Sequence, residues 1–144
     1  MAHHSNRMKI YEILEHTADI RIRVFGRSLD DLFVNAAQAM FNILADEIPC
    51  ANPPIKALII QEAEDVEELF INWLNELLSL SAVEGLVFED IIISDISDKS
   101  VEAVATGTDL RNYKVNSEIK AATYHQLKIE KMQSGWLAEV VFDV

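Results

Sequence analysis

The chain has 144 residues, half of them apolar, which suits one domain with a single core and argues against a disordered protein. Its 24 acidic residues outnumber 12 basic ones, and a net charge of −12 argues against strong direct nucleic-acid binding. The one cysteine, Cys50, cannot form an internal disulfide, and the sequence shows no export signal and no membrane-spanning run. We therefore expect a cytoplasmic protein that does not associate with membranes.

The first seven residues are set apart from the expected domain. Residues 1–7, MAHHSNR, precede a second methionine, Met8, and are expected to be a tag or a disordered overhang. His3 and His4 are therefore excluded from the chemistry. We expect a single domain over residues 8–144.

The N-terminal half predicts two strands, then a helix. Residues 20–26 alternate apolar and polar side chains with the period of a half-buried strand, and residues 9–15 predict a partner strand before a polar turn. Apolar residues then recur at steps of three and four across residues 28–46, with Ser28 and Asp31 as a capping pair. This pattern predicts an amphipathic helix.

Pro53 and Pro54 are followed by a predicted strand and a second predicted helix. Residues 55–63 predict a strand. A second helix is predicted to begin at Asp65, with Glu68 reaching back to its first turn, and to end before Gly85. The segment 109–122 is too polar and aperiodic to assign. Further strands are predicted at residues 86–96, 100–108, 123–132 and 136–144.

This order of elements predicts the fold class. Strands alternating with two broad-faced helices indicate an α+β, two-layer domain, with both helices packed on one face of a mostly antiparallel sheet. Trp73 and Trp136 occur in apolar patterns and are predicted to lie in the core.

Acidic groups at both ends of the chain form the first candidate site. Asp143 and the α-carboxylate of Val144 are adjacent, and Asp19 joins them if the last strand pairs beside residues 20–24. Carboxylates held close together favour a bound cation, and all-oxygen ligands favour Ca²⁺, Mg²⁺ or Mn²⁺ over zinc. The residues alone favour the structural alternative, in which Asp19 caps a turn and Asp143 is a solvated strand end.

Two histidines and a lysine, His16, His125 and Lys120, are further candidates, for partner binding or activation. His16 and His125 could act as bases near neutral pH or orient carboxylates, although a histidine beside a strand is more often simply hydrogen-bonded. Lys120 could pair with a local acid or face a partner, and the residues alone leave both interpretations open.

Five ordered segments of the sequence resemble the archease family. They are EHTADIRIRVFG, LFVNAAQAMFNIL, LFINWLNELL, EIKAATYHQLKIE and GWLAEVVFDV. The resemblance implies a strand-helix-strand-strand module with an insertion. It also implies a protein that is not itself an enzyme but activates the GTP-dependent RNA-splicing ligase of tRNA splicing, promoting its guanylylation and repeated turnover. An alternative implied role is that of a chaperone for a tRNA cytosine methyltransferase.

The resemblance also assigns roles to particular residues. It implies metal ligands at Asp19, Asp143 and Val144, with Ca²⁺ preferred and Mg²⁺ or Mn²⁺ as alternatives, and an activating role for Lys120. Two features depart from the family pattern: Arg21 stands where glycine is usual, and residues 107–115 lack the usual Gly-Glu pair and later histidine. A rival hypothesis makes Asp19, Asp143 and His16 the site of a metal-dependent hydrolase.

Overall fold

The computed structural model describes residues 10–16, 19–47 and 53–144 of the chain. These residues form two α-helices, nine strands and one short 3₁₀ helix. In chain order the elements are β1 (Tyr11–His16), β2 (Asp19–Gly26), α1 (Leu29–Leu44), β3 (Ala45–Glu47), β4 (Ile55–Glu62), α2 (Val66–Glu84), β5 (Leu86–Ile96), β6 (Ser100–Asp109), η2 (Leu110–Asn112), β7 (Tyr113–Val115), β8 (Ala121–Met132) and β9 (Gly135–Asp143).

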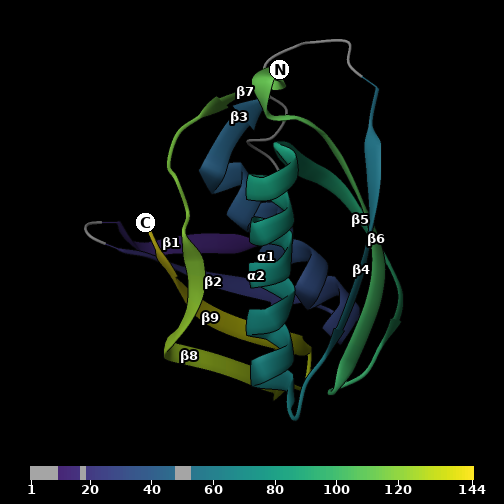
Figure 1. The fold of residues 1–144 in the computed structure, drawn as a ribbon. Coiled ribbons are helices and arrows are strands. Elements are labelled where there is room, and N and C mark those ends of the chain that lie inside the picture. Colours follow the sequence, from purple (N-terminus) through teal and green to yellow (C-terminus); the bar gives the residue numbers. More distant parts are fainter. Residues whose placement is uncertain (1–9, 17–18, 48–52) are drawn as a thin grey trace.

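The described strands form three antiparallel sheets, where the sequence predicts one. A first sheet has the order β1-β2-β9-β8, a second has the order β4-β6-β5, and β3 pairs with β7. Figure 1 shows α1 and α2 between the two larger sheets, and each helix contacts strands of both. The α+β class, with helices packed on antiparallel sheets, is confirmed. The single sheet is divided because β9 pairs with β2 and β8, whereas β6 pairs with β4 and β5.

Both helices begin where their capping residues predict. The Ser28 hydroxyl accepts a hydrogen bond from the Asp31 N–H at 3.4 Å, and the Asp65 carboxylate accepts one from the Glu68 N–H at 2.8 Å. The helix α2 ends at Gly85, whose φ of 67° is the left-handed conformation that glycine adopts without strain. No helix within the described ranges has the length and apolarity needed to cross a membrane.

Aromatic side chains fill the space between the helices. Trp73 is fully buried, as predicted, and its indole N–H donates to the Phe33 carbonyl at 2.9 Å. The rings of Phe33 and Phe70 meet edge to face at 5.3 Å between centroids. The prediction for Trp136 was wrong: its ring is only partly buried, with the Lys131 ammonium 5.8 Å from the ring centroid.

The unassigned segment 109–122 contains two short elements. Asp109 caps the 3₁₀ helix η2 by accepting from the Arg111 N–H at 2.8 Å, and hydrogen bonds from Arg111 lower the pKa of Asp109 to about 2. The strand β7 then pairs with β3, which takes the last residues of the expected first helix. Strands of three residues are too short to show a period-two pattern, so the sequence did not predict them.

Candidate metal-binding tip

One end of the first sheet brings together two carboxylates from distant parts of the chain. Asp19 begins β2, Asp143 ends β9, and the antiparallel register places them directly opposite each other. Directly opposed residues have Cα atoms about 4.5–5.5 Å apart. Both residues are exposed. The pairing on which the acidic cluster depended is therefore present, and we call Asp19, Asp143 and Val144 the acidic tip.

The alternation of β2 explains why Asp19 faces away from the core. Asp19 shares the outer face of the strand with Arg21 and Arg23, because successive side chains of a strand point to opposite faces. The inner face is fully buried under the helices and consists of Ile20, Ile22 and Val24.

A buried glutamate on β9 binds both arginines of this outer face. Arg21 Nη2 donates to Glu139 Oε1, and Arg23 Nε donates to Glu139 Oε2 at 2.9 Å. Arg23 Nη2 also forms an ion pair with Glu139 Oε2 at 2.9 Å. The hydrogen bond from Arg23 and the charges of both arginines lower the pKa of Glu139, although burial opposes this shift. Arg21, the departure from the family pattern, thus belongs to an ion-pair cluster two residues along the strand from Asp19.

The start of β8 lies on the other side of Asp143. Ala121 is opposite Asp143 in the ladder, and the Lys120 backbone N–H donates to the Asp143 carbonyl at 2.8 Å. The Lys120 side chain is exposed. Lys120 therefore lies beside the acidic tip.

A helix residue that the sequence analysis did not identify holds this part of β8. Asn75 of α2 accepts from the Ala122 N–H at 2.8 Å and donates to the Ala122 carbonyl at 3.0 Å. Its side-chain amide thus satisfies backbone groups that a neighbouring strand would otherwise pair. The two residues are 47 positions apart, and no sequence pattern connects a helix asparagine to a distant strand edge.

Only part of His16 can be placed. Its backbone ends β1 opposite Ile20, which is next to Asp19, whereas its side chain and the whole of Thr17 lie outside the described residues. The predicted roles of the His16 imidazole, in partner binding or in a hydrolase site, therefore stay predictions.

The structure does not bring His125 into the row that contains Asp19 and Asp143. His125 is exposed in an irregular stretch of β8, in which the register shifts between Thr123 and Lys128. Gln126 in this stretch has a φ of 53°, which is uncommon for a residue other than glycine. Its predicted role in partner binding also stays a prediction.

The donor chemistry of the acidic tip fits a hard cation. Among the described residues, neither the Asp19 nor the Asp143 carboxylate makes an ion pair or a side-chain hydrogen bond. Within those same residues, no three side chains of His, Cys, Asp or Glu form a metal-binding group. The predicted ligands, the Asp19 and Asp143 carboxylates and the α-carboxylate of Val144, stay a prediction, and all of them offer oxygen. Ca²⁺ and Mg²⁺ commonly complete such a set with water.

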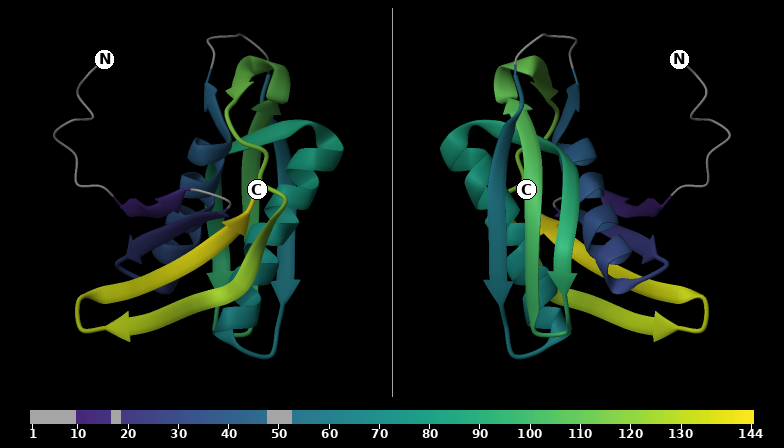
Figure 2. Two further views of the ribbon diagram at one scale, coloured as in Figure 1. Left: turned by 90° about the vertical axis from the view of Figure 1, so that its left-hand side faces the viewer. Right: turned by 90° about the vertical axis from the view of Figure 1, so that its right-hand side faces the viewer.

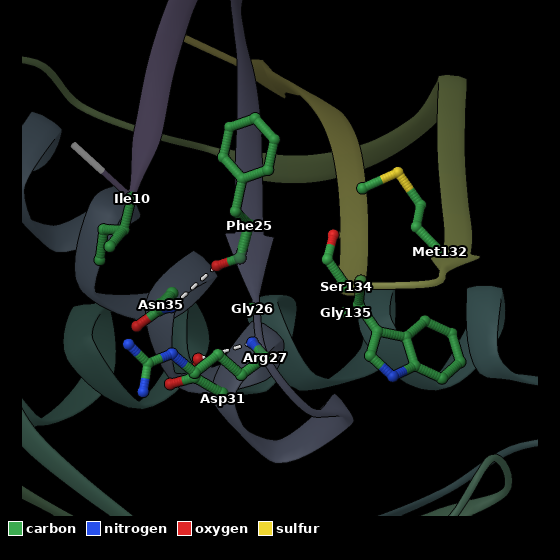
Figure 3. Close-up of a pocket in the computed structure, with 10 residues that line it drawn as sticks. Ile10, Phe25, Gly26, Arg27, Asp31, Asn35, Met132, Ser134 and Gly135 are labelled. Carbon is green, nitrogen blue, oxygen red and sulfur yellow. Dashed lines mark hydrogen bonds between the residues drawn. The ribbon is translucent and has the colours of Figure 1, made fainter. Parts of the chain in front are cut away.

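A cavity of about 590 Å³ lies at the other end of β2 (Figure 3). Asn35 Nδ2 donates to the Phe25 carbonyl at 2.8 Å, and the Arg27 N–H donates to Asp31 Oδ2 at 2.8 Å. These polar groups of the cavity wall therefore already have hydrogen-bond partners within the chain. No sequence pattern predicts a site at this position. The cavity is lined by Ile10, Phe25, Gly26, Arg27, Asp31, Asn35, Met132, Ser134, Gly135 and Trp136.

Comparison with known protein families gives a match over most of the chain. The model of the Archease protein family (MTH1598/TM1083) matches residues 11–144. The protein archease of Methanosarcina barkeri is 38% identical over 146 residues, which cover 97% of this chain and 99% of that protein. The archease of Pyrococcus abyssi is 38% identical over 143 residues, which cover 95% of this chain and 100% of that protein.

Solved structures have the same fold. The solution structure of protein 1598 of Methanobacterium thermoautotrophicum has a TM-score of 0.71 and 28% identity, and the match covers 95% of this chain and 100% of that one. A crystal structure from Thermotoga maritima, described as an archease and possible chaperone, has a TM-score of 0.65 and 24% identity, covering 96% of this chain and 99% of that one. The second likeness shows a shared fold alone.

Proposed function

Because the chain belongs to the archease family, we propose that it activates a GTP-dependent RNA-splicing ligase as a protein partner that is not itself an enzyme. The observation that carries this proposal is the pairing of Asp19 with Asp143 beside Lys120. It creates an exposed end of the sheet with two kinds of charged group, a pair of carboxylates and an ammonium.

The acidic tip is the proposed binding site for a divalent cation, with Ca²⁺ preferred and Mg²⁺ or Mn²⁺ as alternatives. When bound, the cation supplies positive charge between carboxylates that otherwise repel one another. The β2–β9 ladder orients Asp19 and Asp143, and the hydrogen bond from Lys120 fixes the main chain of Asp143.

The charge of the whole protein suits a partner that holds RNA. A net charge of −12 favours contact with the basic surface of an RNA enzyme and leaves the RNA itself bound to that enzyme. The exposed Lys120 side chain is the proposed contact for an acidic group of the ligase. The acidic tip would then favour the ligase conformation that reacts with GTP.

The test is a guanylylation assay with the ligase of the same organism, at substoichiometric amounts of this protein and with Ca²⁺, Mg²⁺ or Mn²⁺ in separate reactions. The parent protein should accelerate guanylylation and multiple-turnover joining, and should join no RNA alone. Asp19→Asn should lose most of the acceleration, whereas the matched variant Asp95→Asn on β5 should keep it. A guanylylation rate that does not change at any ratio contradicts the proposal.

A second candidate function is that of a chaperone for a tRNA cytosine methyltransferase. It rests on the resemblance of the five sequence segments to the archease family, which implies this role as an alternative. If this is the main function, the methyltransferase should stay soluble equally well with the parent protein and with Asp19→Asn. The hydrolase hypothesis has its own test, since it requires the purified protein to cleave RNA or nucleotides with Mg²⁺ or Mn²⁺.

A further inference from the structure

The second sheet has one face that the helices do not cover. The right-hand view of Figure 2 shows β4, β6 and β5 in front of both helices. On this outer face, Leu58, Val104 and Ile92 lie side by side in one row across the three strands. They are 62%, 37% and 65% exposed, respectively, and Ile60, two residues along β4, is 54% exposed. Four large apolar side chains thus form a continuous exposed patch, which is a common feature of interaction surfaces.

The next row on the same face carries opposite charges at its two ends. Lys56 of β4 and Asp90 of β5 both pair in register with Thr106 of β6. The two charged residues are separated by two strand spacings, or roughly 10 Å. Among the described residues, neither makes an ion pair. A positive edge and a negative edge therefore flank the apolar patch at the same level.

We propose that two copies of this chain pack face to face through the row Leu58–Val104–Ile92, about a two-fold axis parallel to β6. Such an axis places β4 of one copy over β5 of the other and keeps each row at its own level. Leu58 then faces Ile92 of the second copy, and Val104 meets its own counterpart at the axis. Antiparallel sheets commonly pack in this aligned way, about 10 Å apart.

The charges identify a second copy as the occupant. An isologous interface requires a surface that complements itself, so every group must face a suitable group of the same surface. The two-fold axis brings Lys56 of each copy opposite Asp90 of the other, and this happens twice in the dimer. The second copy thus supplies the partner of each charge. Within one chain, Lys56 and Asp90 lie on opposite sides of β6, two strand spacings apart.

Two features limit the strength of this association. Each copy carries a net charge of −12, and the Glu102 residues of the two copies face each other at one end of the interface. Both repulsions are screened by salt, with a Debye length of about 8 Å at physiological ionic strength. The patch is also small, so we expect a weak, concentration-dependent dimer.

The first experiment measures self-association of the full chain by sedimentation velocity across a concentration series at fixed salt. The parent protein should shift from monomer to dimer as concentration rises. Leu58→Asp should abolish the shift, whereas Val83→Asp, at a residue of α2 that is 77% exposed, should leave it unchanged. Thermal unfolding of each variant verifies the fold. A parent protein that stays monomeric at every concentration overturns the proposal and leaves the face to a different partner.

Charge exchange tests the predicted pair directly. Lys56→Asp lowers the net charge by two and Asp90→Lys raises it by two, so general repulsion alone would move dimerisation in opposite directions. The pairing instead predicts that both single variants weaken the dimer, by about tenfold, because each puts like charges together twice. The double variant, with the parent's net charge, should restore parent affinity. Single variants with opposite effects, or a double variant without recovery, overturn the two-fold arrangement.

Discussion

Asp19 and Asp143 face each other across the β2–β9 ladder with no positive side chain paired to either one among the described residues. Like charges directly opposite each other on a sheet reduce its stability. On the same face, Arg21, two residues from Asp19, forms an ion pair with Glu139, so opposite charges meet there. The unfavourable arrangement at the end of the ladder is the kind of local conflict that functional sites contain.

Asp19→Asn should have opposite effects with and without the ion. Without divalent ions the variant should be more stable by about 0.5 kcal/mol, because it removes the repulsion across the ladder. In the parent, Ca²⁺ at a hundredfold excess over its dissociation constant should add about 2.7 kcal/mol to the free energy of unfolding. The variant should lose most of this gain. Thermal unfolding with and without Ca²⁺ measures both effects, and an equal gain in variant and parent would rule out Asp19 as a ligand.

Extension of the chain beyond Val144 by a short Gly-Ser tail tests its α-carboxylate. The tail converts the carboxylate into an amide carbonyl, which keeps an oxygen but loses the charge, and hard cations bind more weakly as ligand charge falls. We expect weaker ion binding by calorimetry and an unchanged fold, since the tail leaves from the sheet end. The same tail at the N-terminus is the control. Undiminished ion affinity in the tailed protein would leave Asp19 and Asp143 as the proposed ligands without Val144.

Lys120→Ala separates partner contact from ion binding. The hydrogen bond to Asp143 comes from the backbone N–H, which alanine retains, so ion affinity should not change. Loss of the ammonium should lower ligase activation about tenfold, or about 1.4 kcal/mol, if Lys120 meets a carboxylate of the ligase. Lys114→Ala on β7 is the control for a lost exposed lysine. Full activation by Lys120→Ala would indicate that the lysine has no role in the contact.

Glu139→Gln should make the protein less stable at neutral pH by about 2 kcal/mol, because it leaves Arg21 and Arg23 without their shared carboxylate. The arginines lower the pKa of Glu139 from an ordinary value of 4.5. A lowered native pKa contributes stability that is present above about pH 4.5 and is lost as pH falls through the native value. The difference between parent and variant should therefore shrink in acid. Denaturant unfolding at a series of pH values measures it, and Glu130→Gln, at an exposed pair with Lys128, should show little effect.

Asn75→Ala removes both hydrogen bonds to Ala122 and should cost about 2 kcal/mol, since each contributes about 1 kcal/mol. The Ala122 amide should then exchange with solvent faster than in the parent, because the edge of β8 loses its cover. Asn72→Ala, one turn earlier on the same helix, is the matched control. Unchanged exchange at Ala122 would show that Asn75 does not hold the strand.

The local features of this fold are predictable from the sequence, whereas several of its long-range pairings are not. The alternation of residues 20–26 and the caps at Ser28 and Asp65 each depend on neighbours within a few positions, and the structure confirms them. The division into separate sheets depends on which strands meet, and alternation specifies a strand's faces but not its partners.

The same distinction applies to the candidate site. Asp19 and Asp143 could be predicted as a pair because the resemblance and the end position of each residue pointed to the same ladder. Glu139 could not, since a glutamate in an apolar strand gives no sign that two arginines from a distant strand bury it. Asn75 was missed for a similar reason. Polar residues that satisfy distant groups become visible only when the chain is folded.

The pairing of β2 with β9 also has a consequence for the order of events during biosynthesis. Arg21 and Glu139 are 118 residues apart, so β9, which pairs with β2 in the first sheet, is synthesised long after β2. Until β9 emerges, the edge of β2 that faces away from β1 has no partner strand. Contacts between such distant segments of the chain form slowly. A chain that ends before β9 lacks Asp143 and Val144, two of the three residues of the acidic tip, and two of the three ladders of the first sheet. Synthesis of β9 is therefore a precondition for both the native sheet and the complete acidic tip.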